Sequence, residues 1–406
     1  MLLATDEAKK EILMRVLVIN YEYPPIGGGG GFVTRDILEQ IAKHGHGVTV
    51  ITSHFKGLKR YEKQNGVEIF RVPVILRNKM EVANIPSLLS YLPSSLLRGI
   101  CHRNSHSYDV INTHFTIPSG PTGYLLSKIS GLPNVLSIHG GDIFDPSKAL
   151  SPHKTPVLRN VVQFVLAKAD VVVAQSSDTR ENAYKHYNVN REIKIIPLGI
   201  KKPVFEKRTR YDFNLDYDEI VFCTVGRLIK RKNIDDTLEI LSTLKDRYKF
   251  KFLVIGDGPE RAHLTRHADS FGLEQRVYFL GNVSDEVKFQ VLDLSDCYVS
   301  TALHEGFGLV FLEAMECGLP IICYNCGGQN DFLVSNKTGF LIQLGNKDEF
   351  AQRLVEINSN SELRATMAKY NRNLVKNFYI ETCAEKYINL FESVLKVRSS
   401  VRQYLN

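Results

Sequence analysis

Two glutamates, Glu305 and Glu313, stand on either side of a Gly-Phe-Gly turn that leads into an apolar stretch. Such a turn at the start of a helix exposes backbone N–H groups, which together with the helix dipole favour a bound phosphate. The two carboxylates can accept hydrogen bonds from hydroxyl groups on either side of that phosphate. A sugar on one side and a ribose on the other is the chemistry of a nucleotide-sugar. The spacing alone also fits a surface helix, but the embedded sequence GFGLVFLEAM favours the first interpretation.

A second group of residues is cationic. In the sequence VGRLIKRKN an apolar strand ends at Arg227, and Lys232 opens the next helix. A guanidinium can bind a diphosphate in bidentate fashion, and an ammonium adds a mobile point charge. At this spacing Arg227 and Lys232 can together neutralise a diphosphate leaving group, whereas Lys230 and Arg231 are expected to be solvated.

Two further segments follow predicted strands, where ligands of open α/β sheets bind. Gly27 to Gly31 precede a helix predicted from about Phe32 to His44, and five glycines leave the backbone bare for a ligand or an opposite domain. The spacing is neither a dinucleotide fingerprint nor a phosphate loop with a lysine, and a flexible linker is the alternative. His139 ends a strand in SIHGGDIF, where a purely structural histidine is the alternative.

Length and composition indicate a globular chain of two domains. A chain of 406 residues with 44% hydrophobic and 23% charged residues fits two globular domains of about 200 residues each. No apolar run reaches the roughly 18 residues that a membrane span needs. The seven cysteines are sparse, and we expect Cys317, Cys323 and Cys326 to be small buried thiols rather than metal ligands, as in a reducing cytoplasm. No Asp-x-Asp flanked by apolar strand residues is present, so no metal site is predicted.

The positive charge lies in the first half of the chain. Residues 1–206 hold 25 Lys and Arg against 17 Asp and Glu, whereas residues 207–406 hold 26 against 27. The basic segment from Lys56 to Arg103 contains a leucine-rich stretch, Ile85 to Leu97, which fits either an anionic membrane surface or a buried helix with a basic rim. Nucleic acid is not an expected partner, because no known binding module accompanies the charge.

Short β-rich runs alternate with amphipathic stretches, the pattern of parallel sheets covered by helices. We predict a disordered leader at residues 1–13, a Rossmann-like domain at 14–203, a second Rossmann-like domain at 204–382, and a terminal helix at 383–406. The predicted strands are 16–20, 47–52, 68–72, 109–113, 134–139, 171–175 and 194–197, then 220–226, 251–255, 277–280, 297–300, 320–323 and 339–342.

At these motifs the chain resembles the retaining glycosyltransferases of the two-Rossmann (GT-B) class, family four, whose signature is E-x7-E. The Pro/Gly loop, His-Gly-x-Asp, Gly-Arg-x4-Lys and Gly-x-Gly-Pro segments occur in the family's order, and the resemblance runs from Val16 to about Phe378. One departure is Ile200-Lys201, where the family usually has other residues at the hinge. The resemblance implies two doubly wound α/β domains facing a deep cleft, with the C-terminal helix crossing back to the first domain. It also implies that the domain at 14–203 binds the acceptor and that the domain at 204–382 binds the nucleotide-sugar.

The resemblance also implies an activity. The chain would transfer a sugar from a UDP- or GDP-sugar to a saccharide or lipid-linked acceptor, in cell-envelope or exopolysaccharide biosynthesis, without a metal or other cofactor. The diphosphate itself would help to deprotonate the acceptor. The protein would be cytoplasmic, and peripheral on the inner face of the cell membrane if the basic half binds lipid. Catalytic roles would fall to His139, Glu305, Arg227 and Lys232. Donor binding would fall to Gly28, Gly29, Arg227, Lys232, Val283, Glu305, Gly306, Phe307, Gly308, Leu309, Val310 and Glu313.

Three alternatives use related architecture: a nucleotide-sugar epimerase, a pyridoxal-phosphate-dependent phosphorylase, and a nucleotide-sugar-binding scaffold without turnover. The epimerase is the nearest, and it would need paired acid and base carboxylates in the cleft and no acceptor. The sequence leaves open the donor sugar, the base, the acceptor, the linkage and the oligomeric state.

Overall fold

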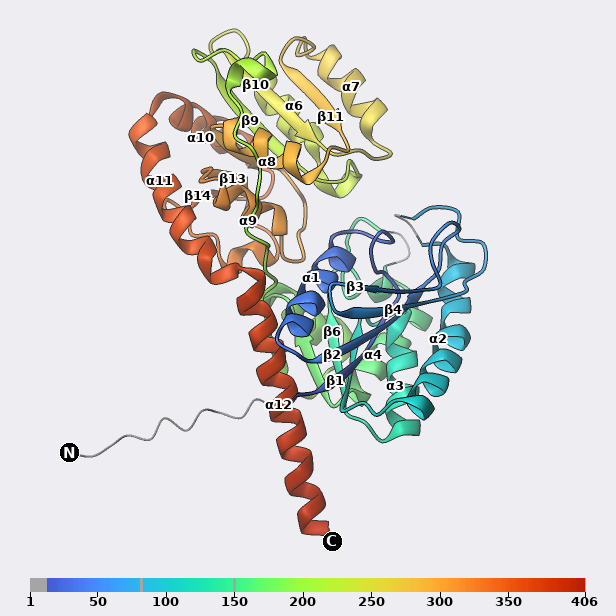
Figure 1. Ribbon diagram of the computed structural model, residues 1–406. Helices are drawn as coiled ribbons and strands as arrows, with labels where there is room; N and C mark the ends of the chain where they lie inside the picture. Colours follow the sequence, from blue (N-terminus) through green and yellow to red (C-terminus); the bar gives the residue numbers. More distant parts are fainter. Residues whose placement is uncertain (1–12, 81–82, 149–150, 406) are drawn as a thin grey trace, which may run out of the picture.

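The computed structural model describes residues 13–80, 83–148 and 151–405 and shows two lobes, each built on a parallel sheet (Figure 1). The N-terminal lobe has an eight-stranded sheet in the order β3-β4-β2-β1-β5-β6-β7-β8, in which only β3 is antiparallel to its neighbour. Its strands are β1 Arg15–Asn20, β2 Gly47–Ser53, β3 Tyr61–Gln64, β4 Val67–Val72, β5 Val110–His114, β6 Asn134–Ile138, β7 Val171–Ala174 and β8 Ile193–Ile195.

The C-terminal lobe has a six-stranded parallel sheet in the order β11-β10-β9-β12-β13-β14. Its strands are β9 Ile220–Val225, β10 Phe250–Ile255, β11 Val277–Gly281, β12 Cys297–Ser300, β13 Ile321–Tyr324 and β14 Gly339–Ile342. In both lobes the strand order reverses beside the first strand, β1 or β9. Ligands of doubly wound sheets bind beyond the carboxyl ends of the strands at that point.

Helices cover both faces of each sheet because the central strands are apolar on both sides, so each face needs a layer that excludes water. The helices of the N-terminal lobe are α1 Gly29–Lys43, α2 Ile85–Ser105, α3 Ser119–Ser130, α4 Pro156–Lys168 and α5 Ser177–Tyr187. Those of the C-terminal lobe are α6 Ile234–Ser242, α7 Arg261–Ser270, α8 Asp285–Leu294, α9 Leu309–Glu316, α10 Lys347–Ser359 and α11 Ser361–Leu374.

The last helix, α12 (Ile380–Leu405), leaves the C-terminal lobe and runs along α1 of the N-terminal lobe (Figure 1). Its side chains Ala384 and Tyr387 are buried in an apolar cluster that contains residues of both lobes, and the Tyr387 hydroxyl lies 3.0 Å from Ser137 Oγ. Beside it, the backbone of Ile200 bonds to Phe378 and Ile380 at 2.9 Å each, so two chain crossings between the lobes lie side by side. The predicted fold class, including the returning helix, is confirmed.

Every predicted strand is present, with ends shifted by a residue or two. β3 was not predicted, because this short edge strand is mostly exposed and has no apolar alternation. The first helix begins at Gly29 rather than near Phe32, so Gly29, Gly30 and Gly31 form its first turn. The predicted leader comprises residues 1–13. Residues 1–12 lie outside the described residues, and Leu13 is exposed just before β1. The boundary at 203/204 lies in the connection between β8 and β9 and stays a prediction.

None of the helices in the described part of the chain is long and apolar enough to cross a bilayer. Helix α2 buries small, polar and aromatic side chains and leaves apolar ones in solvent, since Leu89 and Leu97 are 71% and 66% exposed. The described cysteines are free, and Cys317 and Cys323 are buried while Cys326 is half-buried.

Candidate functional site

Two cations of the C-terminal lobe stand at the carboxyl end of β9. Arg227 is exposed, and its side chain has no hydrogen-bond or ion-pair partner among the residues that the structure describes. Lys232 ends the 3-10 turn η3 (Lys230–Lys232), and its stem passes over Gly226, where an added Cβ would lie 2.9 Å from Lys232 Cε. Glycine at position 226 therefore leaves room for the ammonium to reach forward from the strand.

Glu305 is the carboxylate that faces these cations. Its Oε1 pairs with Lys232 Nζ, its Oε2 lies 3.3 Å from Arg231, and its side chain is 9% exposed. Burial alone would raise the pKa of Glu305, but the charges of Lys232 and Arg231 and their hydrogen bonds lower it to about 2. Glu305 is therefore an ionised acceptor held between two cations.

Glycines position the segment that carries Glu305. Gly327 has a positive φ of 102°, and an added Cβ would lie 2.2 Å from the Glu305 carbonyl oxygen. The next residue, Gly328, donates its N–H to that oxygen at 2.7 Å. Gly308, with φ 94°, begins α9, whose first N–H groups have no acceptor within the helix. The turn thus presents an electropositive helix end beside Lys232, as the sequence predicted.

His139 follows β6 in the N-terminal lobe. Asp142 fixes the turn after it, because its two carboxylate oxygens accept from the N–H groups of His139 at 2.8 Å and Thr116 at 2.7 Å. The imidazole lies against the Phe115 ring at 4.4 Å, and its Nε2 is 2.9 Å from Nδ1 of His114. Burial lowers the pKa of His139 to about 4, so the ring is neutral at physiological pH.

The glycine loop after β1 approaches His139 at Gly30 rather than at the predicted pair Gly28 and Gly29. An added Cβ at Gly30 would lie 2.8 Å from Phe115 Cζ and 3.8 Å from His139 Nδ1. Gly28 and Gly29 have open space around them. Gly30 and Gly31 therefore also serve packing, because their missing side chains let α1 begin against the neighbouring loops.

These groups surround one cavity between the lobes, with a volume of about 350 Å³, within the range of small-molecule sites. Of the predicted site residues, those that line it are Gly29, His139, Arg227, Lys232, Glu305, Gly306, Phe307, Gly308, Leu309 and Val310. Phe307 is itself 2% exposed and packs on Phe332, so it contributes chiefly backbone.

A second hollow of about 340 Å³ adjoins the first and shares Gly226 and Arg227 with it. It contains the other predicted residues Gly28 and Val283, together with Lys288. Glu313 lines neither hollow but lies beside the second, because Lys288 Nζ is 2.7 Å from its carboxylate. Burial raises the pKa of Glu313, and the Lys288 charge offsets this only in part. Arg227 thus stands between a compartment with Glu305 and one near Glu313.

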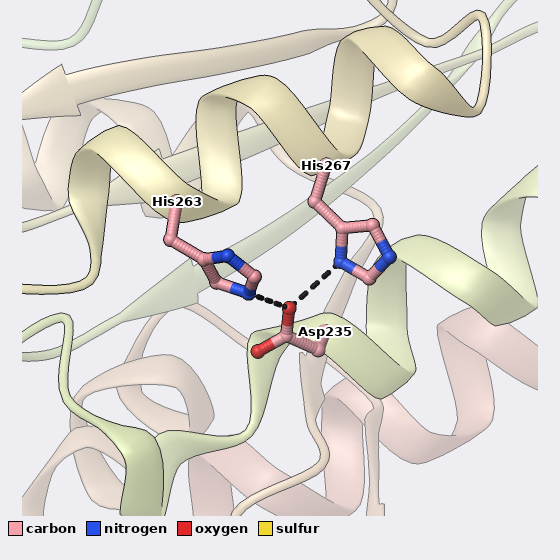
Figure 2. A group of neighbouring side chains, drawn as sticks. All are labelled: Asp235, His263 and His267. Atoms are coloured by element: carbon pink, nitrogen blue, oxygen red, sulfur yellow. Dashed lines mark hydrogen bonds and ion pairs between the residues drawn. The ribbon is translucent and has the colours of Figure 1, made fainter.

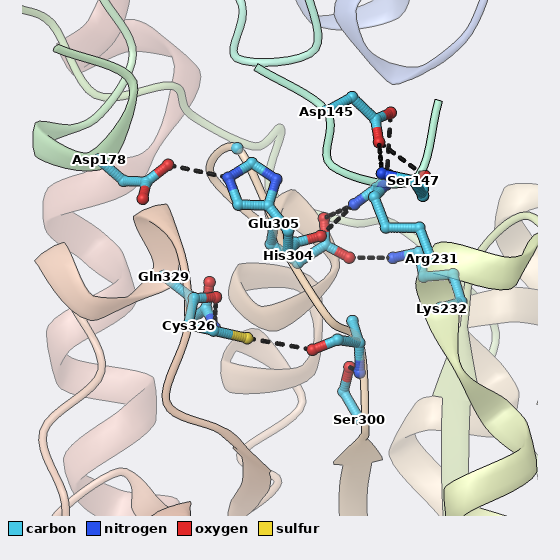
Figure 3. A network of polar contacts seen from close by, with 12 residues as sticks. Asp145, Ser147, Asp178, Arg231, Lys232, Ser300, His304, Glu305, Cys326 and Gln329 are labelled. Atoms are coloured by element: carbon cyan, nitrogen blue, oxygen red, sulfur yellow. Dashed lines mark hydrogen bonds and ion pairs between the residues drawn. The ribbon is translucent and has the colours of Figure 1, made fainter. Parts of the chain in front are cut away.

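Polar contacts cross from one lobe to the other at the rim of the first cavity (Figure 3). His304 Nε2 lies 3.0 Å from the Asp178 carboxylate, and Ser176 Oγ donates to the Gly306 carbonyl at 2.7 Å. The Arg231 guanidinium contacts the Glu305 carboxylate and donates to the His304 carbonyl. It also lies 3.9 Å from the Asp145 carboxylate of the opposite lobe. Asp145 is buried, and burial alone would raise its pKa, but Ser147, Lys148 and Arg231 lower it.

Arg231 was expected to be solvated, and that expectation is wrong. Its side chain is only 19% exposed, since η3 turns it toward Glu305 while Lys230 points outward. Asp145, His114 and Glu22 were not predicted as site residues, although all three lie at the cavity or directly behind it. A usable signal existed for His114, because the apolar residues Val110 and Ile111 are followed by Asn112, Thr113 and His114 at the carboxyl end of the strand, where ligands of such sheets bind.

Two family models cover most of the chain. Residues 27–202 match the model described as Glycosyltransferase Family 4, and residues 205–374 match the one described as Glycosyl transferases group 1. The chain belongs to the family-four glycosyltransferases. The confirmed resemblance makes this protein a GT-B enzyme, and the cavity between its lobes is the place where the two matched halves meet.

Curated relatives of this glycosyltransferase span its length. It is similar to the N-acetyl-α-D-glucosaminyl L-malate synthase of Bacillus anthracis, 27% identical over 92% of this chain and 96% of that protein. It is also similar to a putative teichuronic acid biosynthesis glycosyltransferase of Bacillus subtilis, 26% identical over 84% of this chain and 88% of that protein.

Solved structures share the fold. The sucrose-phosphate synthase of Thermosynechococcus elongatus superposes with a TM-score of 0.82 at 21% identity, over 95% of this chain and all of that one. The Anabaena protein HepE, solved in complex with UDP, superposes with a TM-score of 0.75 at 20% identity, over 94% of this chain and all of that one.

Proposed function

We propose that this glycosyltransferase moves a sugar from a nucleotide-diphosphate sugar to a hydroxyl of a saccharide or lipid-linked acceptor, with retention of the anomeric configuration and without a metal. One observation carries the proposal: Arg227, Lys232, Glu305 and the first turn of α9 face a single space, with His139 opposite. Cations and helix N–H groups stabilise a departing diphosphate, and a fixed carboxylate accepts from sugar hydroxyls.

In the proposed complex the diphosphate lies against Arg227, Lys232 and the N–H groups of Gly308, Leu309 and Val310. Glu305 accepts from a sugar hydroxyl in the first cavity, and Glu313 accepts from the ribose diol beside the second. Val283 lies in the second hollow, which supports binding of the base there. This arrangement fits a UDP- or GDP-sugar, and the UDP complex of the structurally similar HepE favours the uridine nucleotide.

The transfer breaks the bond between the anomeric carbon and the diphosphate oxygen and forms a bond from that carbon to the acceptor oxygen. The acceptor proton passes to the departing diphosphate on the same face of the ring, so no protein general base is assigned. His139 and the glycine loop close over the donor from the N-terminal lobe. Closure excludes water, which otherwise hydrolyses an activated sugar.

The acceptor belongs on the N-terminal side of the first cavity, and it comes from cell-envelope or exopolysaccharide synthesis. Two observations support this. Lys148, Phe115 and Glu22 line the N-terminal wall and offer a cation, a ring and a carboxylate to a polyhydroxylated molecule. The name of the Bacillus subtilis relative places that protein in the synthesis of a cell-wall polymer.

We further propose that the N-terminal lobe docks on an anionic membrane from the cytoplasmic side. Ile75, Leu76, Leu89 and Leu97 are exposed on α2 and on the loop before it, and Lys79 in that loop is exposed as well. Apolar side chains beside lysine and arginine suit the headgroup region of an anionic bilayer. Co-sedimentation with phosphatidylglycerol vesicles at low and high salt tests this, and a Leu76→Glu, Leu89→Glu variant should remain in the supernatant. Equal sedimentation of both proteins contradicts it.

The donor is tested first by thermal unfolding against a panel of nucleotide-sugars, because a ligand that binds only the folded protein raises Tm with its concentration. Transfer by the stabilising donor is then followed with and without EDTA, and proton NMR of the product reads the anomeric configuration. An inverted product contradicts retention, and loss of transfer in EDTA contradicts metal independence. Donor incubated alone distinguishes the epimerase alternative, which would yield an epimer without any acceptor.

A further inference from the structure

Three side chains with metal-ligating atoms meet on the C-terminal lobe, outside both hollows of the donor site. His263 and His267 project from consecutive turns of α7 toward Asp235 in the first turn of α6 (Figure 2). Asp235 Oδ1 lies 2.7 Å from His263 Nε2 and 2.7 Å from His267 Nδ1. Histidines four residues apart share one face of a helix, so α7 presents both rings to the same point.

The chemistry of this cluster is that of a transition-metal site. Two imidazole nitrogens and one carboxylate oxygen are ligands that Zn²⁺ takes with bonds of roughly 2.0–2.2 Å, leaving one position for water. All three ligand atoms lie within 4.8 Å of one another, so small rotations of the side chains would bring them to those lengths. The side chains of His263, Asp235 and His267 are 52%, 33% and 29% exposed, which leaves the cluster open to ions in solution.

The surrounding charges leave Asp235 available. Over residues 13–80, 83–148 and 151–405, its carboxylate has ion-pair partners only in the two histidines. The next acid along, Asp236, is already occupied by Lys347 at 2.8 Å and by the Tyr324 hydroxyl at 2.9 Å. A metal ion at Asp235 would therefore displace no lysine or arginine.

We propose that Asp235, His263 and His267 bind one divalent transition-metal ion of the zinc class. The ion would cross-link the first turn of α6 to the middle of α7. Because α6 begins directly after Lys232 and Asn233, the cross-link holds the base of the loop that carries the cations of the donor site. The three ligands line neither hollow, so the ion is structural and is separate from the proposed metal-free transfer.

The test uses the full chain after treatment with EDTA and dialysis. Isothermal titration should show one equivalent of Zn²⁺ binding at micromolar concentration, and Co²⁺ should give visible absorption bands of a low-coordinate site. Affinity should fall about tenfold or more in His263→Ala and in Asp235→Asn. Of these, His263→Ala carries the test because the ring is half exposed, so its loss costs little packing.

His106→Ala is the matched control. His102 and His106 are also four residues apart, and their rings stack at 4.8 Å, but His102 Nδ1 bonds to the Tyr108 hydroxyl and no carboxylate joins them in the described chain. This variant should bind Zn²⁺ as the wild type does. Zn²⁺ should raise Tm in the wild type and not in His263→Ala, while transfer persists in EDTA. Absence of binding at submillimolar Zn²⁺, or undiminished binding by His263→Ala and Asp235→Asn, overturns the proposal without touching the donor site.

Discussion

His114 Nδ1 lies 2.9 Å from His139 Nε2, and the surroundings of His114 determine which of these nitrogens carries a hydrogen. The side-chain amide of Asn112 donates to the Val135 carbonyl and to Ser137 Oγ, so its Oδ1 is free to accept from His114 Nε2 at 2.8 Å. Neutral His114 then has its lone pair on Nδ1 and accepts the Nε2–H of His139. His139 Nδ1 is left as a bare acceptor without a partner in the described structure, beside Gly30.

This proton assignment makes His114 a positioning residue for His139. Replacement of His114 by Phe keeps the ring against Tyr387 but removes the acceptor, so His139 is free to adopt the other tautomer and to turn. A buried hydrogen bond of this kind contributes about 1–3 kcal/mol, so kcat/KM should fall about ten- to a hundredfold. His114→Gln, which restores an acceptor oxygen, should recover part of the loss. Wild-type kinetics in His114→Phe would contradict the assignment.

The same pair predicts how stability depends on pH. Burial lowers the pKa of His139 to about 4, and burial together with His139 lowers that of His114 well below its usual value. The unfolded chain binds protons at these histidines near pH 6.5, and the folded chain does not. The stability that the neutral histidines contribute is therefore fully present above pH 6.5, and the free energy of unfolding falls as the pH drops toward 4. For His139 the full loss is about 3 kcal/mol. Urea unfolding at pH 7 and pH 5 measures it, and His139→Gln should show a smaller difference between the two.

Much of this enzyme was predictable because its signals are local. Buried parallel strands are continuous apolar runs, and the ends of β1, β6 and β9 carry residues that packing does not require. Glu305 was predicted from its place before the Gly-Phe-Gly turn, and Arg227 and Lys232 were assigned from the family resemblance. The structure brings all three to one cavity.

The residues that were missed depend on contacts that form only in the folded chain. Arg231 reads as one of three successive basic residues, and only the 3-10 turn and the approach of Asp145 from the other lobe show that it faces inward. Glu22 lies behind the glycine loop and accepts from the Gly28 N–H at 3.3 Å, a relation that appears only when the loop is folded. The cluster on α6 and α7 likewise joins residues 28 and 32 positions apart.

Arg227→Ala should abolish transfer while leaving the fold intact. The side chain has no partner to lose in the described structure, and it stands between the two hollows that would hold the diphosphate. Loss of one preorganised group that stabilises developing charge costs about a hundred- to a thousandfold in kcat. Lys230→Ala is the control on the same turn, since Lys230 is exposed and lines neither hollow. Circular dichroism and Tm should match the wild type in both variants, and unchanged turnover in Arg227→Ala contradicts the diphosphate site.

Glu313→Gln should weaken nucleotide binding more than it slows the chemical step. The amide keeps one acceptor oxygen for the ribose. It loses the negative charge that pairs with Lys288 and strengthens the hydrogen bonds from the ribose hydroxyls, so we expect KM for the donor to rise about tenfold. Glu316→Gln lies one turn further along α9, where Glu316 bonds to the Tyr379 hydroxyl at 2.8 Å, and should leave KM unchanged. Binding of the free nucleoside diphosphate, measured by titration calorimetry, separates a ribose contact from a contact to the sugar.

Arg231→Met removes the cation that joins Glu305 to Asp145 and so tests two consequences together. Glu305 keeps Lys232 but loses one of the two charges that hold its pKa near 2, so its pKa should rise. A carboxylate with a raised pKa becomes protonated at a higher pH. The acid limb of the pH profile of kcat/KM should therefore shift to higher pH than in the wild type. The contact to the opposite lobe also disappears, so kcat should fall even at neutral pH, where Glu305 is still ionised. Lys230→Met, one residue earlier on the same turn, should change neither, and a pH profile of Arg231→Met that overlies the wild type would show that Arg231 does not tune Glu305.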